Sequence, residues 1–210
     1  NGGALHRRAG ALRPRAAVEA LLRDAELMLG MEMTAIERVG QAWLVRGADG
    51  RALFKADAIV LACGAWLAGF EPASFLPIRL SRGQIEWGPV EGAPPTRASV
   101  RGNYVTPFAD GILFGATFDR TEGDLPLAVD EASRARNLAA LAGLAPELAA
   151  RLRVAELHSR VSHRAAMPDR APIAGLMPDA PAWLSQNAAL AHGGEPDARL
   201  PPPALPGVFV

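Results

Sequence analysis

The spacing of apolar residues predicts a helix and then a hairpin in the first part of the chain. Alanine, valine and leucine recur at three- and four-residue intervals behind Pro14, which suits the first helical position. We therefore expect a helix over Pro14–Leu29, which a glycine ends. Residues 31–45 then alternate apolar with polar side chains on either side of Gly40, the pattern of two antiparallel strands joined by a turn.

An uninterrupted apolar run, Ala58–Ala62, predicts a strand buried on both faces, as in the centre of a parallel sheet. After Pro77 the pattern changes to short segments separated by turn residues such as Ala109–Gly111. These segments predict an antiparallel set of strands over residues 78–87, 102–107 and 111–118.

Helical spacing returns over residues 130–152, with a break at Gly143 and a second helix starting at Pro146. A strand over Val154–Val161 is expected next. The segment 180–206 is rich in Pro, Ala and Gly with little periodicity, which predicts a loop, and a strand is expected from Gly207. Strands of both kinds together with helices indicate an α/β (α+β) fold.

Composition narrows the class of protein. The 210 residues include 22 basic and 22 acidic side chains and are 50% apolar, which indicates a core-forming protein and argues against strong nucleic-acid binding by this piece alone. Cys63 is the single cysteine, so no internal disulfide is possible. The longest uncharged apolar run, residues 58–70, is too short to span a bilayer, and no apolar signal segment opens the chain. We expect a cytoplasmic protein with no membrane partner.

The common nucleotide and metal motifs are missing. The chain contains no GxGxxG, GxxxxGK[ST], HExxH or paired-cysteine pattern, and its four histidines are scattered. No metal site is predicted. Candidate chemistry therefore rests on three less specific stretches.

The first stretch is Cys63-Gly64-Ala65-Trp66 at the end of the predicted buried strand. Open α/β sheets bind ligands beyond the carboxyl ends of their strands, and Gly64 would let a cofactor approach the backbone. An ordinary strand-to-turn glycine would leave the same pattern. Cys63 is interpreted as a small buried apolar residue, because no activating base is evident.

The second stretch is Ser81-Arg82-Gly83-Gln84, inside an otherwise apolar strand. These are poor core residues, so a polar ligand passing over the sheet would explain them. An edge strand is the alternative.

The third stretch is Arg160–Gly175, in which Arg164 is chosen to hold a substrate carboxylate through two parallel hydrogen bonds. A surface ion pair is the alternative explanation for this arginine. His163 is interpreted as structural.

In this order, the three stretches resemble the D-amino-acid oxidase-like family of FAD-dependent amine oxidoreductases, also called the DAO or glycine oxidase superfamily. Within it, the chain is most similar to the C-terminal oxidase module of bifunctional tRNA-modifying proteins. The resemblance is carried by Gly10–Pro14, the strand into Cys63-Gly64, Leu76–Gln84, the hairpin segments 102–107 and 114–118, and Arg164–Gly175.

The resemblance implies a Rossmann-type FAD-binding domain interleaved with an antiparallel-sheet substrate domain. Residues 1–75 would form part of the FAD-binding domain, 76–165 the substrate domain, and 166–210 the return to the first. The cofactor-binding residues implied are Cys63, Gly64, Ala65, Trp66, Arg82, Gly83, Gln84, Asp169, Pro172 and Gly175. The substrate-binding residues implied are Arg82, Gln84, Tyr104 and Arg164.

The implied reaction is amine oxidation by hydride transfer to flavin, followed by imine hydrolysis and reoxidation by oxygen. No side chain is certain to be catalytic, because the flavin performs the redox step. For the tRNA-modifying subfamily, the substrate would be the carboxymethylaminomethyl group of a wobble uridine, with tRNA as partner. A glycine, sarcosine or D-amino-acid oxidase is the alternative.

The same resemblance implies that parts of the family pattern lie outside this chain. The glycine-rich loop that cradles the FAD pyrophosphate is expected upstream of Asn1, and a second glycine-rich segment after Val210. A methyltransferase domain is expected further upstream. The 210 residues are therefore interpreted as an internal fragment, and an inactive fragment that binds no flavin is a third hypothesis.

Overall fold

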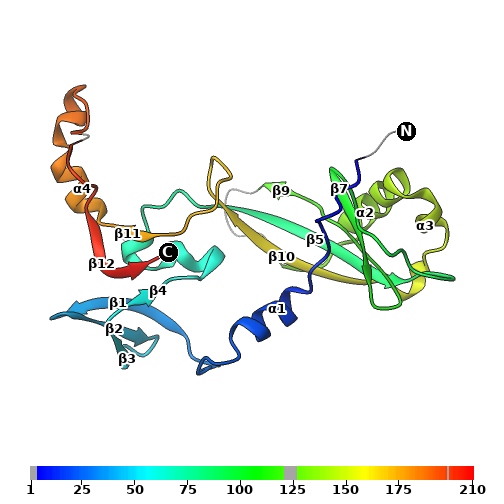
Figure 1. Cartoon of the computed structure of the whole chain (residues 1–210), viewed down its shortest axis with the longest axis horizontal. Helices are drawn as coiled ribbons and strands as arrows, with labels where there is room; N and C mark the ends of the chain where they lie inside the picture. Colours follow the sequence, from blue (N-terminus) through cyan, green and yellow to red (C-terminus); the bar gives the residue numbers. More distant parts are fainter. Residues whose placement is uncertain (1–3, 121–126, 198) are drawn as a thin grey trace. The chain divides into compact units, whose positions relative to one another are not determined.

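The chain forms two compact units in a computed structural model that describes residues 4–120, 127–197 and 199–210 (Figure 1). The first unit runs from the N-terminus to Leu27 and from Ser81 to Arg164, and the second from Met28 to Leu80 and from Ala165 to Val210. Assigning substrate binding to one and FAD binding to the other stays a prediction.

A six-stranded sheet is the framework of the first unit. Its strands follow the order β10-β5-β8-β7-β6, and β9 also pairs with β5. The strands are β5 (Arg79–Pro89), β6 (Ser99–Arg101), β7 (Asn103–Phe108), β8 (Gly111–Gly115), β9 (Asp119–Arg120) and β10 (His158–Ala166). Phe108 pairs with Gly111 across the β7–β8 hairpin, so the turn predicted at Ala109–Gly111 is confirmed.

Two helices, α2 (Glu131–Leu144) and α3 (Pro146–Ala150), belong to the same unit (Figure 1). Leu141 of α2 packs with Val105, Ile112 and Phe114 of the sheet in one apolar cluster. The helix start at Pro146 is confirmed, because a proline is accommodated at the first turn of a helix but not in its interior. The break itself lies at Ala145 and not at Gly143, which α2 includes.

Helix α1 (Pro14–Leu21) is shorter than the predicted Pro14–Leu29. It buries none of its residues. Helices of this length depend on packing for stability, and the apolar spacing after Leu21 meets no core that would continue the helix.

The strand predicted over Val154–Val161 is displaced along the chain. Residues Val154–Glu156 form a 3-10 turn, and β10 begins only at His158 and continues to Ala166. Arg164 consequently lies within a strand rather than beyond its end.

The second unit contains a meander of β1 (Met33–Val39), β2 (Ala42–Gly47) and β3 (Ala52–Ala56). Val39 pairs with Ala42, which confirms the hairpin turn around Gly40. The inward-facing residues of the meander join Met177 and Val208 in the core of this unit; they are Ile36, Trp43 and Val45.

A second small sheet follows the order β11-β12-β4, with β11 (Leu176–Pro178), β12 (Ala204–Phe209) and β4 (Ile59–Val60). The parallel pairing of β4 with β12 agrees with the predicted parallel strand. Among the described residues β4 lies at the edge of its sheet and not in the centre, and Val60 is 67% exposed, which differs from the predicted strand buried on both faces. A Cβ on Gly207 would lie 2.6 Å from the carbonyl oxygen of Asp57, so β12 approaches this segment closely.

The segment 180–206 is not only loop. It contains α4 (Ala180–Gln186) and a 3-10 turn over Ala188–His192, and β12 already begins at Ala204. The Asp179 carboxylate caps α4 by accepting a hydrogen bond from the backbone N–H of Ala182. Across the described ranges, no helix combines the length and apolar character needed to cross a membrane.

Candidate functional site

Strand β5 alternates between two environments. Arg82, Gln84 and Glu86 are buried, at 6%, 0% and 0% exposure, whereas Gly83 and Ile85 between them are only half-buried. Successive strand residues point to opposite faces of a sheet. The sheet of the first unit therefore has a helix face, which α2 covers, and an opposite face that we call the open face.

Arg82 is tied into the start of α2 on the helix face. Its guanidinium forms ion pairs with Asp130 at 2.8 Å and Asp119 at 3.6 Å, and donates a hydrogen bond to Ser133 Oγ at 3.2 Å. The backbone N–H and hydroxyl of Ser133 donate to Asp130, and with the Arg82 charge they lower the pKa of that carboxyl. Arg82 thus neutralises two carboxylates at a helix N-terminus.

Gln84 and Glu86 continue this polar network. The Gln84 amide nitrogen donates to Glu86 Oε1 at 2.8 Å and to the Asp130 carbonyl at 3.0 Å, while its oxygen accepts from the Asp130 N–H at 3.0 Å. Glu86 also accepts hydrogen bonds from Ser159 of β10 and from Asn137 of α2. Buried polar groups require such partners. We call this set of residues, with Arg82, the buried network.

The predicted run Arg82-Gly83-Gln84 therefore divides between the two faces. The side chains of Arg82 and Gln84 point to the helix face and take part in the buried network. A Cβ on Gly83 would lie 3.1 Å from the Thr117 carbonyl oxygen, so close strand packing accounts for this glycine. Contact of these three residues with a ligand stays a prediction.

Sequence reasoning missed the partners of the buried network, namely Asp130, Ser133, Asn137 and Ser159. One signal was available: Asp130 followed three residues later by Ser133 at the start of a helical pattern is a capping arrangement. The polar residues on alternate positions of β5 then form hydrogen bonds with polar residues at the start of this helix.

The open face carries a different group of side chains at the β10 end. The Arg164 guanidinium carbon lies 4.6 Å from the centroid of the Phe118 ring, within cation–π range. Tyr104 of β7 is near enough that the Arg164 charge lowers the pKa of its phenol, although burial has the larger effect and raises it. Both Arg164 and Phe118 are exposed. The structure brings together two predicted substrate residues, Tyr104 and Arg164, with Phe118, which was not predicted.

Strand β9 connects this group to the buried network. Asp119 directly follows Phe118 and pairs with Arg82 in the β5–β9 ladder. Its carboxylate accepts two hydrogen bonds from Arg136 at 2.7 and 2.9 Å, which is the main cause of its lowered pKa. The contacts of Asp119 on the helix face thereby hold the neighbouring residue Phe118 in position.

The remaining predicted cofactor residues lie in the second unit. Cys63 precedes a 3-10 helix over Gly64–Gly69, which begins shortly after the end of β4 at Val60. Gly64 has a φ of +56° with no atom within 4 Å of a hypothetical Cβ, and Trp66 is 76% exposed. Burial raises the pKa of the Cys63 thiol, which opposes a thiolate nucleophile at neutral pH.

Asp169, Pro172 and Gly175 form an exposed turn and the approach to β11. The Asp169 carboxylate accepts from the backbone N–H of Ala171 at 2.9 Å. Gly175 exchanges two backbone hydrogen bonds with Val210, both at 2.9 Å. Since β12 runs parallel to β4, the Gly175 and Gly64 segments both lie beyond the carboxyl ends of these strands.

This edge of the second unit fits a cofactor. The space above Gly64 is open, and its left-handed backbone suits a glycine that allows a close approach. Ligands of open α/β sheets bind in the same position relative to the strand ends. Contacts between FAD and these residues stay a prediction.

Comparison with models of protein families identifies the family of this chain. The DAO family profile, described as FAD dependent oxidoreductase, matches residues 1–195. The chain belongs to the DAO family. FAD is the cofactor of this family, so the predictions of family, cofactor and oxidoreductase class are confirmed.

Curated DAO relatives share substantial identity with the chain. The tRNA 5-methylaminomethyl-2-thiouridine biosynthesis bifunctional protein MnmC of Caulobacter vibrioides is 42% identical over 143 residues, which cover 68% of this chain and 23% of that protein. The protein of the same name from Pseudomonas putida (strain W619) is 32% identical and covers 100% of this chain and 33% of that protein. The chain therefore spans a quarter to a third of these relatives.

Solved DAO structures confirm the fold class. Iminodiacetate oxidase from Chelativorans sp. BNC1 superposes with a TM-score of 0.63 at 22% identity, covering 90% of this chain and 58% of that one. Glycine oxidase from Geobacillus kaustophilus superposes with a TM-score of 0.59 at 21% identity, covering 71% and 40%.

The Asp119–Arg136 interaction predicts a defined acid response. Because the pKa of Asp119 is lowered in the folded chain, its stabilising contribution is present above the unfolded value near 3.8 and lost as the pH falls below it. In urea unfolding from about pH 5 to about pH 3, Asp119→Asn should lose less stability than the wild type.

Arg136→Gln is the matched control, because it removes the cause of the same shift. It should reduce the acid response similarly, and the double variant should show no further reduction. Equal pH slopes in all four proteins would disprove the coupling.

Proposed function

We propose that this chain is part of an FAD-dependent oxidoreductase that removes the carboxymethyl group from carboxymethylaminomethyl-uridine at the tRNA wobble position. Two observations support the proposal: the curated relatives named for tRNA 5-methylaminomethyl-2-thiouridine biosynthesis, and the exposed Arg164 on the open face beside Phe118 and Tyr104. The Arg164 group is the observation that carries it, because such a substrate ends in a carboxylate.

The reaction breaks the bond between the amine nitrogen and the glycine-derived carbon. FAD, when bound, accepts a hydride from that carbon. Water then hydrolyses the resulting imine, which leaves the aminomethyl group on the uridine and releases the two glycine-derived carbons as glyoxylate. In this proposal the chain itself binds and orients the substrate.

Arg164 holds the substrate carboxylate through two parallel hydrogen bonds, a geometry for which a guanidinium is suited. Phe118 limits the freedom of the guanidinium from one side, and Tyr104 offers a hydroxyl on the same face. Fixing the carboxylate orients the neighbouring C–N bond for hydride transfer. Arg82 and Gln84 support the site from the helix face, while Gly83 borders it on the open face.

The second unit supplies cofactor contacts in this proposal. Gly64 and Gly175 allow close approach at one sheet edge, and Cys63, Ala65, Trp66, Asp169 and Pro172 belong to the same two segments. The chain would be one part of a longer bifunctional protein that also carries a methyltransferase domain. A tRNA substrate would place that protein in the cytoplasm.

The direct test uses the complete natural protein that carries this chain, loaded with FAD and incubated with tRNA bearing the carboxymethylaminomethyl group. Mass spectrometry of the digested nucleosides should show conversion to the aminomethyl form. Oxidation of glycine, sarcosine or a D-amino acid without any change in tRNA would instead identify a small-molecule oxidase. An unmodified tRNA and no amine turnover would refute both.

Arg164→Gln should raise KM for the tRNA substrate by about 10- to 100-fold, because a charge-assisted hydrogen bond is lost. Arg160→Gln is the matched control, as an exposed arginine on the same strand. Steady-state kinetics should show a KM effect in the first variant only. An equal rise in KM in both variants would show that Arg164 contributes only to the overall charge of this face and does not bind the substrate carboxylate.

Phe118→Leu should raise KM by about 2- to 5-fold, because cation–π contacts at exposed sites are weak. The same substitution should change nothing further when combined with Arg164→Gln, since the ring acts through the guanidinium. Additive effects in the double variant would separate Phe118 from Arg164.

A further inference from the structure

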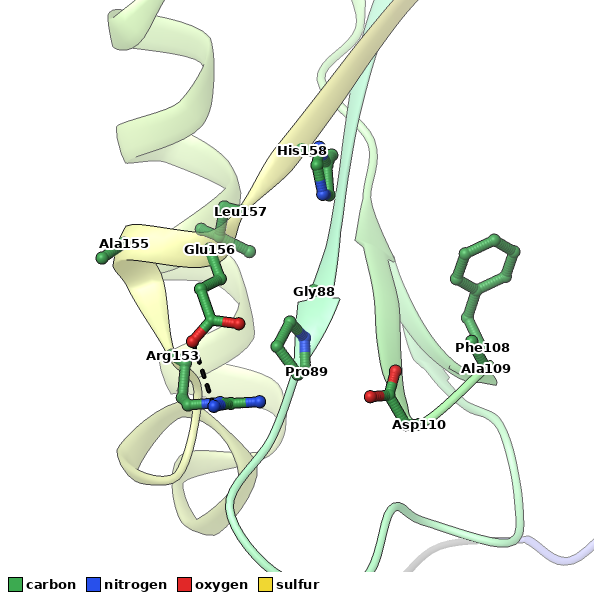
Figure 2. Close-up of a pocket in the computed structure, with 10 residues that line it drawn as sticks. All are labelled: Gly88, Pro89, Phe108, Ala109, Asp110, Arg153, Ala155, Glu156, Leu157 and His158. Carbon is green, nitrogen blue, oxygen red and sulfur yellow. Dashed lines mark ion pairs between the residues drawn. The ribbon is translucent and has the colours of Figure 1, made fainter.

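A pocket lies in the first unit, where β5 ends. It is an open pocket with a volume of about 460 Å³, bordered by the end of β5, the β7–β8 turn and the segment leading into β10 (Figure 2). The residues used below are Pro89, Phe108, Asp110, Arg153, Glu156 and His158. This volume is within the range of small-ligand sites.

Aromatic rings border this pocket on the side of the open face. Trp87 stacks on His158 with ring centroids 5.5 Å apart and an angle of 24° between the planes. Trp87 also meets Phe108 edge to face at 6.2 Å. His158 is exposed and Phe108 is 38% exposed, so both present ring surface to a ligand. Phe108 and His158 line the pocket, with Trp87 in contact with both behind them, and an exposed ring of this kind can stack with another flat ring.

Polar groups frame the same pocket. Figure 2 shows the Asp110 carboxylate on one side of Pro89 and the Arg153–Glu156 ion pair, 3.0 Å long, on the other. An ionised carboxylate can only accept hydrogen bonds, so Asp110 suits a ligand with amino or imino groups on its edge. Arg153 has further N–H groups besides the one that meets Glu156, and these can donate to a phosphate oxygen.

The backbone of the turn is unusual as well. Ala109, between Phe108 and Asp110, has a φ of +50°, in the left-handed region that asparagine and glycine normally occupy. Such conformations occur disproportionately at ligand sites. Here the conformation sets the direction of the two flanking side chains that line the pocket.

The pocket is separate from the Arg164 group. His158 and Arg164 lie on one strand six positions apart, which corresponds to about 20 Å. A small amine held by Arg164 could not reach the pocket. A macromolecular substrate could occupy both.

We propose that this pocket binds an unpaired base of the RNA whose wobble nucleotide is held at Arg164. The base stacks against the rings that line the pocket, with Phe108 as the main contact and His158 beside it, and its amino or imino edge donates to Asp110. Arg153 faces the adjacent phosphate. Single-stranded RNA is commonly recognised through such stacking and edge contacts. The inference rests on the proposed function, since a tRNA anticodon loop supplies unpaired bases beside the modified uridine.

The test measures RNA binding to the complete, FAD-loaded protein by fluorescence anisotropy. The probes are an anticodon stem-loop RNA with uridine at the wobble position and a fully paired RNA of the same length. Phe108→Ala should weaken binding of the stem-loop by about 10- to 100-fold, because a stacking contact is lost. Asp110→Ala should also weaken it, because the hydrogen bond to the base edge is lost. Binding of the paired RNA should not change in either variant.

Phe75→Ala is the matched control, because Phe75 is similarly exposed at 42% and lies in the other unit. It should bind both RNAs as the wild type does. Asp110 is an exposed turn residue, so its variant keeps the test valid even if Phe108→Ala disturbs the hairpin. Circular dichroism verifies folding of each variant.

Turnover of the free carboxymethylaminomethyl-uridine nucleoside separates this inference from the proposed reaction. Both variants should oxidise the nucleoside at the wild-type rate. Unchanged stem-loop affinity, or equal loss for the stem-loop and the paired RNA, would overturn the base pocket even if the nucleoside is oxidised. Selective loss of stem-loop binding without nucleoside turnover would support the pocket and refute the reaction.

Discussion

The buried charges of β5 constrain the rest of the first unit. Arg82 and Glu86 are almost fully buried, and a buried ion that loses its partner destabilises a protein by about 3 to 5 kcal/mol. In the α2 region, Asp130 and Ser133 are partners of Arg82, and Arg134 and Asn137 are partners of Glu86. This requirement fixes which face of the sheet the helix covers. The opposite face is consequently the one that can receive a ligand.

Strand β10 relates the two ends of that open face. Ser159 joins the strand to Glu86 on the helix face, while His158 and Arg164 are exposed near its two ends. At one end, Asp119 of β9 forms ion pairs with Arg82 and Arg136. Phe118, the residue before it, contacts the Arg164 guanidinium. At the other, His158 stacks on Trp87. A single strand thus sets the spacing between Arg164, which we propose binds a carboxylate, and the aromatic pocket.

Much of the fold could be predicted from local sequence signals. The hairpins around Gly40 and Ala109–Gly111 and the helix start at Pro146 follow from turn chemistry and are confirmed. The length of α1 and the edge position of β4 depend on which core each element meets, which periodicity does not report. Arg82 and Gln84 drew attention as polar residues in an apolar strand. Their partners at the start of α2 lie 46 residues (Gln84 to Asp130) and 51 residues (Arg82 to Ser133) further along the chain, so the sequence alone could not separate a ligand from a helix N-terminus.

Membership of the DAO family identifies FAD as the cofactor. The geometry of the open face is the basis for our proposal that the substrate binds there. The most direct measurement is a crystal structure of the complete, FAD-loaded protein with a non-oxidisable carboxylate analogue of the substrate. The account predicts that the carboxylate lies within hydrogen-bonding distance of the Arg164 guanidinium. A carboxylate bound away from Arg164 would contradict it.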